Sequence, residues 1–191
     1  SHAALTEPLA CGWHAVKLGM NSLTVNASTV KCLIIGGGAI GVGVCLSLRA
    51  KGLEDIIIIE KNPLRRENLQ HNLFNGVEIL EDLDPEILYD LVIDAVGYSD
   101  TRSVASNVCR PGGVIIHIGL GDGLGGLNIR RMTLQEITFI GTYTYTTKDF
   151  EETAEAIFSG KMGSFKWVEK RNLKEGNIAF KDILTGKVSA S

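Results

Sequence analysis

Short apolar runs alternate with longer amphipathic stretches through most of the chain. The run from Ile56 to Ile59 is apolar on both faces of a strand, as expected inside a parallel sheet covered by helices. Strands are predicted at residues 31–35, 55–60, 77–80, 91–96, 114–118 and 137–141. Helices are predicted at 6–19, 39–51, 63–73, 100–109, 149–159 and 177–186, with a loop over 161–176. The alternation predicts an α/β fold, a doubly wound six-stranded parallel sheet of order 3-2-1-4-5-6 with helices on both faces.

Residues with strong turn or cap preferences mark several element boundaries. Thr6 is a candidate cap for the first helix, and Gly19 a candidate end for it. Cys109 is expected to end the helix at 100–109, and Pro111 with the next two glycines to turn the chain into the following strand. All 191 residues then fit one domain, whose first 20 residues form a helix leading into it.

A glycine loop lies between the first predicted strand and the helix after it. Gly36, Gly38 and Gly41 have G-x-G-x-x-G spacing, and Glu60 ends the next apolar run. The glycines allow a tight turn, close approach of a pyrophosphate to the backbone, and close packing of the helix on the strand. The helix N-terminus attracts the phosphate charge. Strand, loop, helix and downstream acid in this order predict a dinucleotide-binding site.

Glu60 and Arg65 bear on the choice of dinucleotide. A carboxylate at the strand tip accepts hydrogen bonds from ribose hydroxyls and repels a 2′-phosphate, so Glu60 favours NAD. Arg65, with Arg66 beside it, is the competing feature, because a guanidinium could pair with that phosphate. The alternative for Glu60 is a solvated strand end without a ligand.

A second glycine pattern overlaps the first. Gly37, Gly41 and Gly43 fit the G-x-x-x-G-x-G spacing of short-chain dehydrogenases. Those enzymes need a lysine four residues after a tyrosine to lower its pKa. The residues four positions after the tyrosines are Ile93, Arg102, Thr147 and Asp149. None of them is lysine, so this interpretation fails.

Composition and charge exclude other classes. The residues are 45% hydrophobic and 21% charged, which supports a buried core and argues against disorder. A net charge of −3 argues against nucleic acid and anionic membrane as partners. The apolar runs are too short to span a membrane. The cysteines lack C-x-x-C spacing, and we expect reduced thiols in a cytoplasmic protein; they are Cys11, Cys32, Cys45 and Cys109.

Several motifs together resemble one family. The matching segments begin at Glu7-Pro-Leu-Ala-Cys-Gly-Trp-His-Ala15 and continue with Gly36 to Gly41, Asp94-Ala-Val-Gly97, Arg110-Pro-Gly-Gly113 and Glu136 to Gly141. In this order they resemble the coenzyme-binding (Rossmann) domain of zinc-dependent medium-chain alcohol and polyol dehydrogenases. The Glu-Pro start of the first helix is most similar to the polyol and butanediol dehydrogenase branch.

The resemblance implies a role for individual cofactor-binding residues. The pyrophosphate would lie on the backbone at Ala39 and Ile40, and the adenosine ribose between Glu60 and Arg65. The adenosine half would rest on Val96 and Gly97. The nicotinamide would be lined by Ile118, Gly119 and Leu120, and its carboxamide bound by the backbone of Thr142, Tyr143 and Thr144.

The resemblance also implies a catalytic zinc in the full-length parent. Glu7 would point at it, as a ligand or through water; alternatively its carboxylate stabilises a helix N-terminus. The family's catalytic domain, with its Cys and Gly-His-Glu ligands, would precede residue 1. The histidines here lack metal-ligand spacing; they are His2, His14, His71 and His117. We therefore expect this chain alone to bind NAD without turnover.

The implied function is an oxidoreductase that moves hydride between NAD and a secondary alcohol or polyol. Which alcohol is left open, because most of the substrate pocket would lie elsewhere. Two alternatives remain at this point: a zinc-free quinone reductase of the same superfamily, and a non-enzymatic NAD-sensing module. The resemblance also implies a homodimer or tetramer.

The last predicted strand suggests how copies would associate. Residues 137–141 form the sheet edge, and Thr142 to Thr146 extend it with high β-propensity. Unpaired backbone groups at such an edge can pair with a second copy. The alternative is that residues 132–135, or the 161–176 loop, cover the edge.

Overall fold

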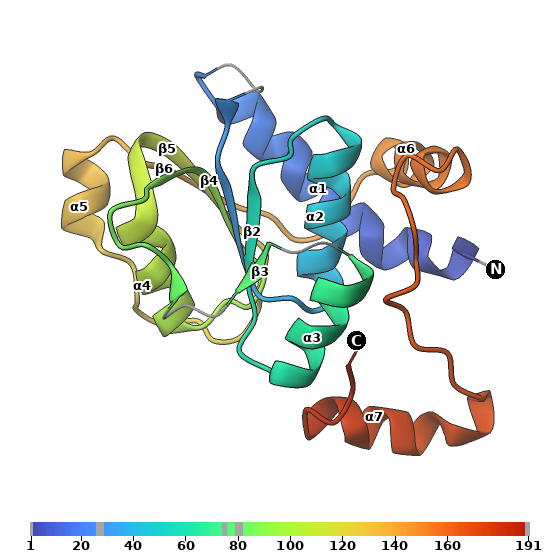
Figure 1. The fold of residues 1–191 in the computed structure, drawn as a ribbon. Helices are drawn as coiled ribbons and strands as arrows, with labels where there is room; N and C mark the ends of the chain where they lie inside the picture. The colour runs from blue at the N-terminus through green and yellow to red at the C-terminus, as the bar shows by residue number, and fades with distance from the viewer. Residues whose placement is uncertain (1, 26–28, 74–75, 79–81, 190–191) are drawn as a thin grey trace.

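The chain folds around one parallel sheet between two helical layers (Figure 1). The computed structural model describes residues 2–25, 29–73, 76–78 and 82–189. The strands are β1 (Cys32–Ile35), β2 (Ile56–Ile59), β3 (Val77–Glu78), β4 (Tyr89–Asp94), β5 (Cys109–His117) and β6 (Thr138–Gly141). All neighbours pair in parallel, in the order β3-β2-β1-β4-β5-β6. The predicted Rossmann topology is confirmed.

The helices cover both faces of the sheet. They are α1 (Thr6–Ser22), α2 (Ala39–Ala50), α3 (Pro63–Asn72), α4 (Ser99–Val108), α5 (Ile129–Leu134), α6 (Thr147–Phe158) and α7 (Gly176–Leu184), with 3-10 turns η1 (His2–Leu5) and η4 (Leu173–Glu175). In Figure 1, α1, α2, α3 and α6 lie on one side of the sheet, and α4 and α5 on the other. The segment after α7 is tied to the α3 region, because Asn62 and Asn68 donate to the carbonyls of Gly186 and Ser189.

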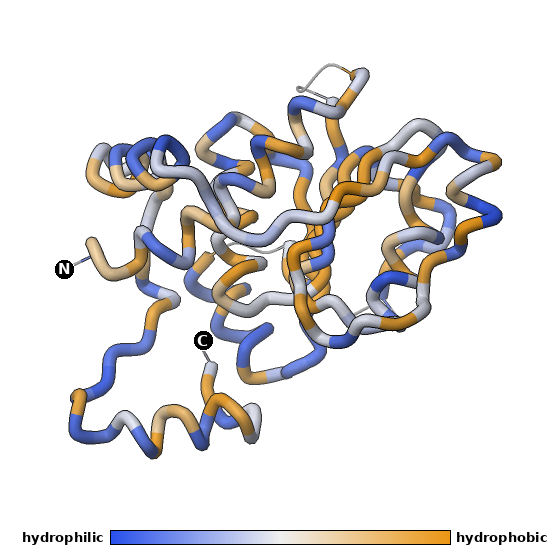
Figure 2. Tube along the Cα trace, turned by 180° about the vertical axis from the view of Figure 1, so that it is seen from behind, coloured by the Kyte–Doolittle hydropathy of each residue, from blue (hydrophilic) through white to orange (hydrophobic). Residues whose placement is uncertain are grey.

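Alternate strand residues supply two separate cores. In β1, Cys32 and Ile34 face the core shared with α1, α2 and α6, whereas Leu33 and Ile35 face the α4 and α5 side. Both faces are therefore apolar, which explains the unbroken hydrophobic runs. Figure 2 shows these runs as hydrophobic segments through the centre of the molecule.

The first helix begins at Thr6 as predicted, but the predicted cap and the predicted end are wrong. Leu5 precedes the helix and Thr6 is its first residue; within the described part of the chain no side chain caps it. Gly19 lies inside the helix, which continues to Ser22. A Cβ at Gly19 would lie 2.9 Å from the Leu91 side chain, so this glycine permits close packing on the sheet and does not end the helix.

Two further differences concern β5 and α5. Cys109 starts a strand and pairs with Tyr89, so the predicted helix end and the turn at Pro111 are wrong. The register shifts between Tyr89 and Leu91, and Gly112 takes a φ of 67°, which lets the strand pass through a sequence that resembles a turn. The short helix α5 was not predicted; the Asn128 side chain caps it by accepting from the Arg131 N–H.

The remaining boundaries agree closely, with two exceptions. Residues 79 and 80 of the third predicted strand lie outside the described residues. The extension of the last strand through Thr142 to Thr146 is wrong, since β6 ends at Gly141. Thr146 instead caps α6, and a threonine that bonds the helix start cannot also continue a strand ladder. In the described part of the chain, no helix has the length and apolarity to cross a membrane.

Candidate dinucleotide site

The loops that follow β1, β4, β5 and β6 lie at one edge of the sheet. Backbone bonds continue past the strand ends: Ala95 N–H donates to Ile35, Ile118 N–H to Asp94, and Thr142 N–H to His117, at 2.9–3.0 Å. The carboxyl ends of parallel strands meet at this edge, where α/β folds bind ligands. The fold therefore brings the predicted glycine loop and the three predicted downstream segments together.

Two glycines of the loop, Gly36 and Gly41, leave no room for a side chain. Gly36 has a φ of 100°, and a Cβ at Gly41 would lie 1.8 Å from the Gly36 carbonyl oxygen. The third glycine therefore lets the first turn of α2 close onto the loop, as the motif predicts.

The N-terminus of α2 lacks a side-chain cap. Within the described residues no side chain caps α2, whose N-cap is Gly38; the same is true of α1 and α7, but only α2 follows a glycine loop. Gly38, Ala39 and Ile40 are half-buried. Helix N-terminal N–H groups without a protein acceptor, at the positive end of the helix dipole, suit an anion such as pyrophosphate.

The loops after β4 and β5 touch through their glycines. A Cβ at Gly97 would lie 2.2 Å from the Gly119 oxygen, and a Cβ at Gly119 would lie 2.2 Å from Val96. Asp94 supports the first loop, because its buried carboxylate accepts from the N–H groups of Val96 and Gly97 at 3.0 and 2.9 Å. The backbone segments predicted to contact the adenosine half and the nicotinamide are therefore in direct contact with each other.

Arg102 holds the same two loops and was not singled out from the sequence. Its guanidinium is 6% exposed and donates to the carbonyls of Gly97, Asp122, Leu124 and Gly125, and it also pairs with the Asp122 carboxylate. Hydrogen bonds from Arg102 and Ser99 lower the pKa of Asp122. The sequence carries no signal for this role, since the partners are backbone groups of a loop about twenty residues away.

Glu60 is buried at the tip of β2 and is not a solvated strand end, so that alternative is wrong. It is 4% exposed. Its Oε2 accepts from Gly37 N–H at 2.9 Å and from Arg65 Nη1 at 3.1 Å, and its Oε1 accepts from Asn62 N–H at 2.7 Å. The acid is therefore fixed beside the glycine loop, with Arg65 as its counter-ion.

Arg65 and Arg66 differ in what they contact. Arg66 donates to the Glu60 carbonyl at 2.8 Å. Arg65 is paired with the Glu60 carboxylate, and its buried Nε has no hydrogen-bond partner among the described residues. A buried donor beside a fixed carboxylate is chemistry that suits a ribose, which offers hydroxyl groups to both.

The predicted nicotinamide side is more open. Ile118 is buried, but Leu120 is 80% exposed and Tyr143 is 75% exposed. Thr142 Oγ1 is buried without a hydrogen-bond partner among the described residues. His117, at the end of β5, packs on Phe139 with ring centroids 5.6 Å apart.

Comparison with known proteins agrees with this geometry. The family model described as "Zinc-binding dehydrogenase" matches residues 39–159, which is more than half of the chain. The chain belongs to the zinc-binding dehydrogenase family.

Relatives of this zinc-binding dehydrogenase chain include alcohol and polyol enzymes. It is 28% identical to a probable diacetyl reductase [(R)-acetoin forming] 2 of Saccharomyces cerevisiae, over 97% of this chain and 46% of the relative. It is also 28% identical to L-galactonate-5-dehydrogenase of Escherichia coli, over 84% of this chain and 48% of the relative. The chain thus spans about half the length of these relatives.

A solved structure shares the fold. Acetophenone reductase from Geotrichum candidum, in complex with NAD, matches 98% of this chain and 53% of its own chain, with a TM-score of 0.79 and 23% identity.

A complete zinc site is not formed by the part of this dehydrogenase chain that the structure describes. Across residues 2–25, 29–73, 76–78 and 82–189, no three His, Cys, Asp or Glu side chains are grouped to hold a metal ion. Glu7 is exposed in the first turn of α1 and accepts from the Tyr145 hydroxyl at 3.3 Å. His14 lies 2.8 Å from the Asp149 carboxylate, and His2 packs on Phe165. One carboxylate alone does not fit a zinc ion.

The four cysteines of the zinc-binding dehydrogenase chain are free thiols. Burial raises the pKa of Cys32, Cys45 and Cys109 to about 12. Cys11 is half-buried, and both partial burial and the Glu7 carboxylate raise its pKa. Packing is thus the role of the three buried thiols.

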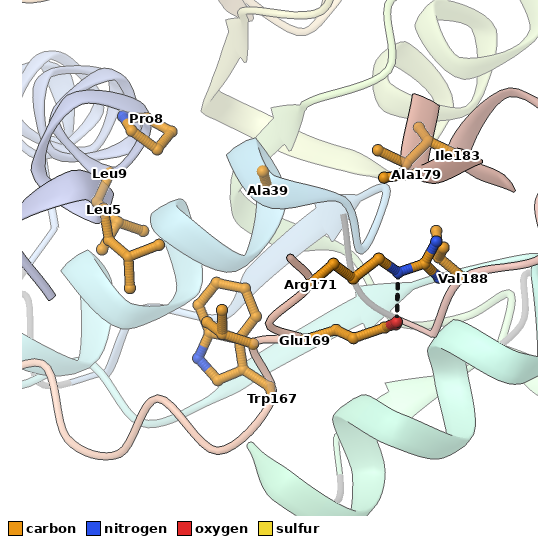
Figure 3. Close-up of a pocket in the computed structure, with 11 residues that line it drawn as sticks. Leu5, Pro8, Leu9, Ala39, Trp167, Glu169, Arg171, Ala179, Ile183 and Val188 are labelled. Atoms are coloured by element: carbon orange, nitrogen blue, oxygen red, sulfur yellow. Dashed lines mark hydrogen bonds and ion pairs between the residues drawn. The ribbon is translucent and has the colours of Figure 1, made fainter. Parts of the chain in front are cut away.

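An apolar pocket of about 340 Å³ opens beside the start of α2 (Figure 3). Leu5, Pro8 and Leu9 line it on one side, and Ala179 and Ile183 of α7 on the other. Glu169 and Arg171 form an ion pair within it. Of the described residues that line the pocket, only Ala39 belongs to the predicted cofactor set. The pocket therefore adjoins the predicted site without coinciding with it.

Proposed function

We propose that this chain is the NAD-binding unit of an oxidoreductase that interconverts a secondary alcohol or polyol and its carbonyl. The observation that carries the proposal is the uncapped N-terminus of α2 in a glycine loop, with buried Glu60 beside it. The names of the relatives support the substrate class, since they include a diacetyl reductase and a galactonate dehydrogenase. In this proposal residues 1–191 form one dinucleotide-binding domain.

Each part of the site has a binding role in this proposal. The N–H groups at Ala39 and Ile40 bind the pyrophosphate, and Glu60 with Arg65 holds the adenosine ribose. Val96 and Gly97 support the adenosine half. The backbone at Ile118 to Leu120 and at Thr142 to Thr144 orients the nicotinamide and excludes water from one face. When bound, the nicotinamide ring supplies the hydride chemistry.

The zinc part of the proposal concerns one described residue, Glu7. We propose that Glu7 faces a metal whose other ligands come from elsewhere in the protein. The alternative is that the Glu7 carboxylate stabilises the N-terminus of α1. The 191-residue chain is then expected to be inactive with or without added zinc. Zinc-dependent oxidation of butanediol or sorbitol by this chain would contradict that expectation.

Titration with reduced dinucleotides tests the cofactor. The expected result is tighter binding of NADH than of NADPH, because the buried Glu60 carboxylate repels a 2′-phosphate. Nicotinamide fluorescence or calorimetry measures both affinities. Tighter binding of NADPH would show that Arg65 outweighs Glu60 and would reject the preference for NAD.

We also propose that two copies pair through the β6 edge. Thr142 N–H points toward β5, so strand alternation directs the N–H groups of Phe139 and Gly141 to the open side. The Met132 carbonyl accepts from Ile137 N–H, so α5 occupies only the start of this edge. A dimer in sedimentation equilibrium, lost in Phe139→Pro, is the expected result. A wild-type monomer at tens of micromolar would reject the pairing.

A further inference from the structure

The loop between β6 and α6 is held to α1 through Tyr145 and through Thr146. This loop, Thr142 to Thr146, carries the backbone proposed to orient the nicotinamide. The Tyr145 hydroxyl donates to Glu7 Oε1 at 3.3 Å. Thr146 bonds to Asp149, which in turn bonds to His14 and Lys17.

Asp149 is the centre of the second attachment. Its side chain is 0% exposed, yet it is surrounded by donors. Oδ2 accepts from Thr146 N–H at 3.0 Å and from Thr146 Oγ1 at 2.6 Å, and it lies 2.8 Å from His14 Nδ1. Oδ1 accepts from Lys17 Nζ at 2.7 Å. One carboxylate thus joins the end of the loop to two side chains of α1.

The charges around Asp149 show that it is held as an anion. Burial by itself would raise the pKa of Asp149, but the hydrogen bonds from Lys17, Thr146 and His14 lower it below its ordinary range. The bond to Asp149 raises the pKa of Lys17. Glu152 on α6 also faces α1, 3.9 Å from Lys17 Nζ and 2.9 Å from Trp13 Nε1.

We propose that Asp149 is a positioning residue for the nicotinamide end of the dinucleotide, acting by holding the Thr142 to Thr146 loop against α1. The proposal rests on the proposed NAD-binding function. Its physical basis is preorganisation: a loop fixed before binding has less conformational entropy to lose when its backbone meets the ligand. The sequence shows Asp149 only as a helix residue; its partners His14 and Lys17 lie 135 and 132 positions away.

Comparing two ligands tests the role. ADP-ribose has the pyrophosphate and both riboses but no nicotinamide ring, so it does not reach the loop's carboxamide site. In Asp149→Asn, NADH affinity is expected to fall about tenfold while ADP-ribose affinity stays within about twofold. The emission of bound NADH should also move back toward that of free NADH. If Asp149 had a purely structural role, its substitution would lower the affinities for both ligands equally.

A second variant protects the test against misfolding. If Asp149→Asn does not fold, Lys17→Met removes one donor at a side chain that is 34% exposed. This variant is expected to lower the affinity for NADH about threefold and to leave the affinity for ADP-ribose unchanged. The matched control is Glu175→Gln, which alters another capping-box acid, bonded to Asn172 N–H at 3.0 Å in η4. This control should change neither affinity.

The outcomes separate the two proposals. A wild-type chain that binds neither ligand overturns the NAD-binding function, and the positioning role with it. A wild-type chain that binds both, with the NADH to ADP-ribose affinity ratio unchanged in the folded variants, overturns the positioning role alone.

Discussion

The two ends of the proposed dinucleotide site are built differently. At the adenosine end, Glu60 is 4% exposed and bonds two backbone N–H groups and Arg65. At the nicotinamide end, Leu120 and Tyr143 are 80% and 75% exposed, and the loop that carries Tyr143 is held from α1.

This difference indicates that the two ends have different roles in binding. In the proposed site, Glu60 at the adenosine end is fixed by hydrogen bonds within the chain, so we expect this end to select the dinucleotide. The nicotinamide end presents apolar side chains to solvent, as expected where a further surface of the protein or a substrate completes the site. Substitutions of the buried groups at the first end should therefore affect stability and binding together, whereas substitutions of the exposed side chains at the second, such as Leu120, should mainly affect binding.

The largest effect is expected at the glycine loop. Gly41→Ala places a Cβ 1.8 Å from the Gly36 oxygen, so the loop and the first turn of α2 must separate. The free energy of unfolding should fall by about 3 kcal/mol, and NADH and ADP-ribose should both be lost. Urea unfolding and calorimetry measure these effects. Gly176→Ala is the control, because a Cβ there meets open space, and it should be neutral.

The next largest effect is expected at Asp149, the buried residue that joins the Thr142 to Thr146 loop to α1. Its folded pKa lies below the ordinary 3.8, so its stabilisation is complete above that value and is lost as the pH falls through the folded pKa. Asp149→Asn should cost about 2 kcal/mol at neutral pH, since charge-assisted bonds from Lys17 are weakened. The difference in the free energy of unfolding between this variant and the wild type should become smaller at acidic pH.

Urea unfolding at neutral pH and again well below pH 3.8 measures that difference. Lys17, His14 and Glu152 also face this site. The double variant Lys17→Met with Asp149→Asn separates the contribution of Lys17 from that of Asp149. A pH-independent difference would show that Asp149 is not held as an anion.

A smaller effect is expected from Glu60→Ala. Removing the carboxylate frees Arg65 and removes the repulsion of a 2′-phosphate, so the preference for NADH over NADPH should narrow about tenfold, or about 1.4 kcal/mol. Fluorescence titration with both dinucleotides measures it. Glu78→Ala, on the neighbouring strand β3, is the control and should keep the wild-type ratio. An unchanged ratio in Glu60→Ala would remove Glu60 as the selecting group.

The smallest effect on stability is expected at Leu120. Its side chain is 80% exposed, so Leu120→Ala should change the free energy of unfolding by less than about 0.5 kcal/mol. NADH affinity should still fall, about threefold, while ADP-ribose affinity should not. A large loss of stability would mean that the nicotinamide end is packed within the chain after all, and the comparison of the two ends would fail.

The sheet could be predicted because its inner strands, such as β1 and β2, are buried on both faces and are therefore hydrophobic without interruption. The glycine loop and Glu60 could be predicted because each follows directly from local spacing. The strand start at Cys109 could not, since it depends on pairing with Tyr89 across the sheet. Arg102 and Asp149 act on backbone and side chains brought close only by the fold.

Of the four cysteine thiols, one is exposed enough to react with thiol reagents. Three of the four cysteines are buried, so thiol reagents do not reach them while the chain is folded. Cys11 is half-exposed, and its Sγ lies 3.9 Å from the Glu7 carbonyl. A maleimide dye is therefore expected to attach at one position, one helical turn from Glu7, and to report spectroscopically on whatever approaches the start of α1.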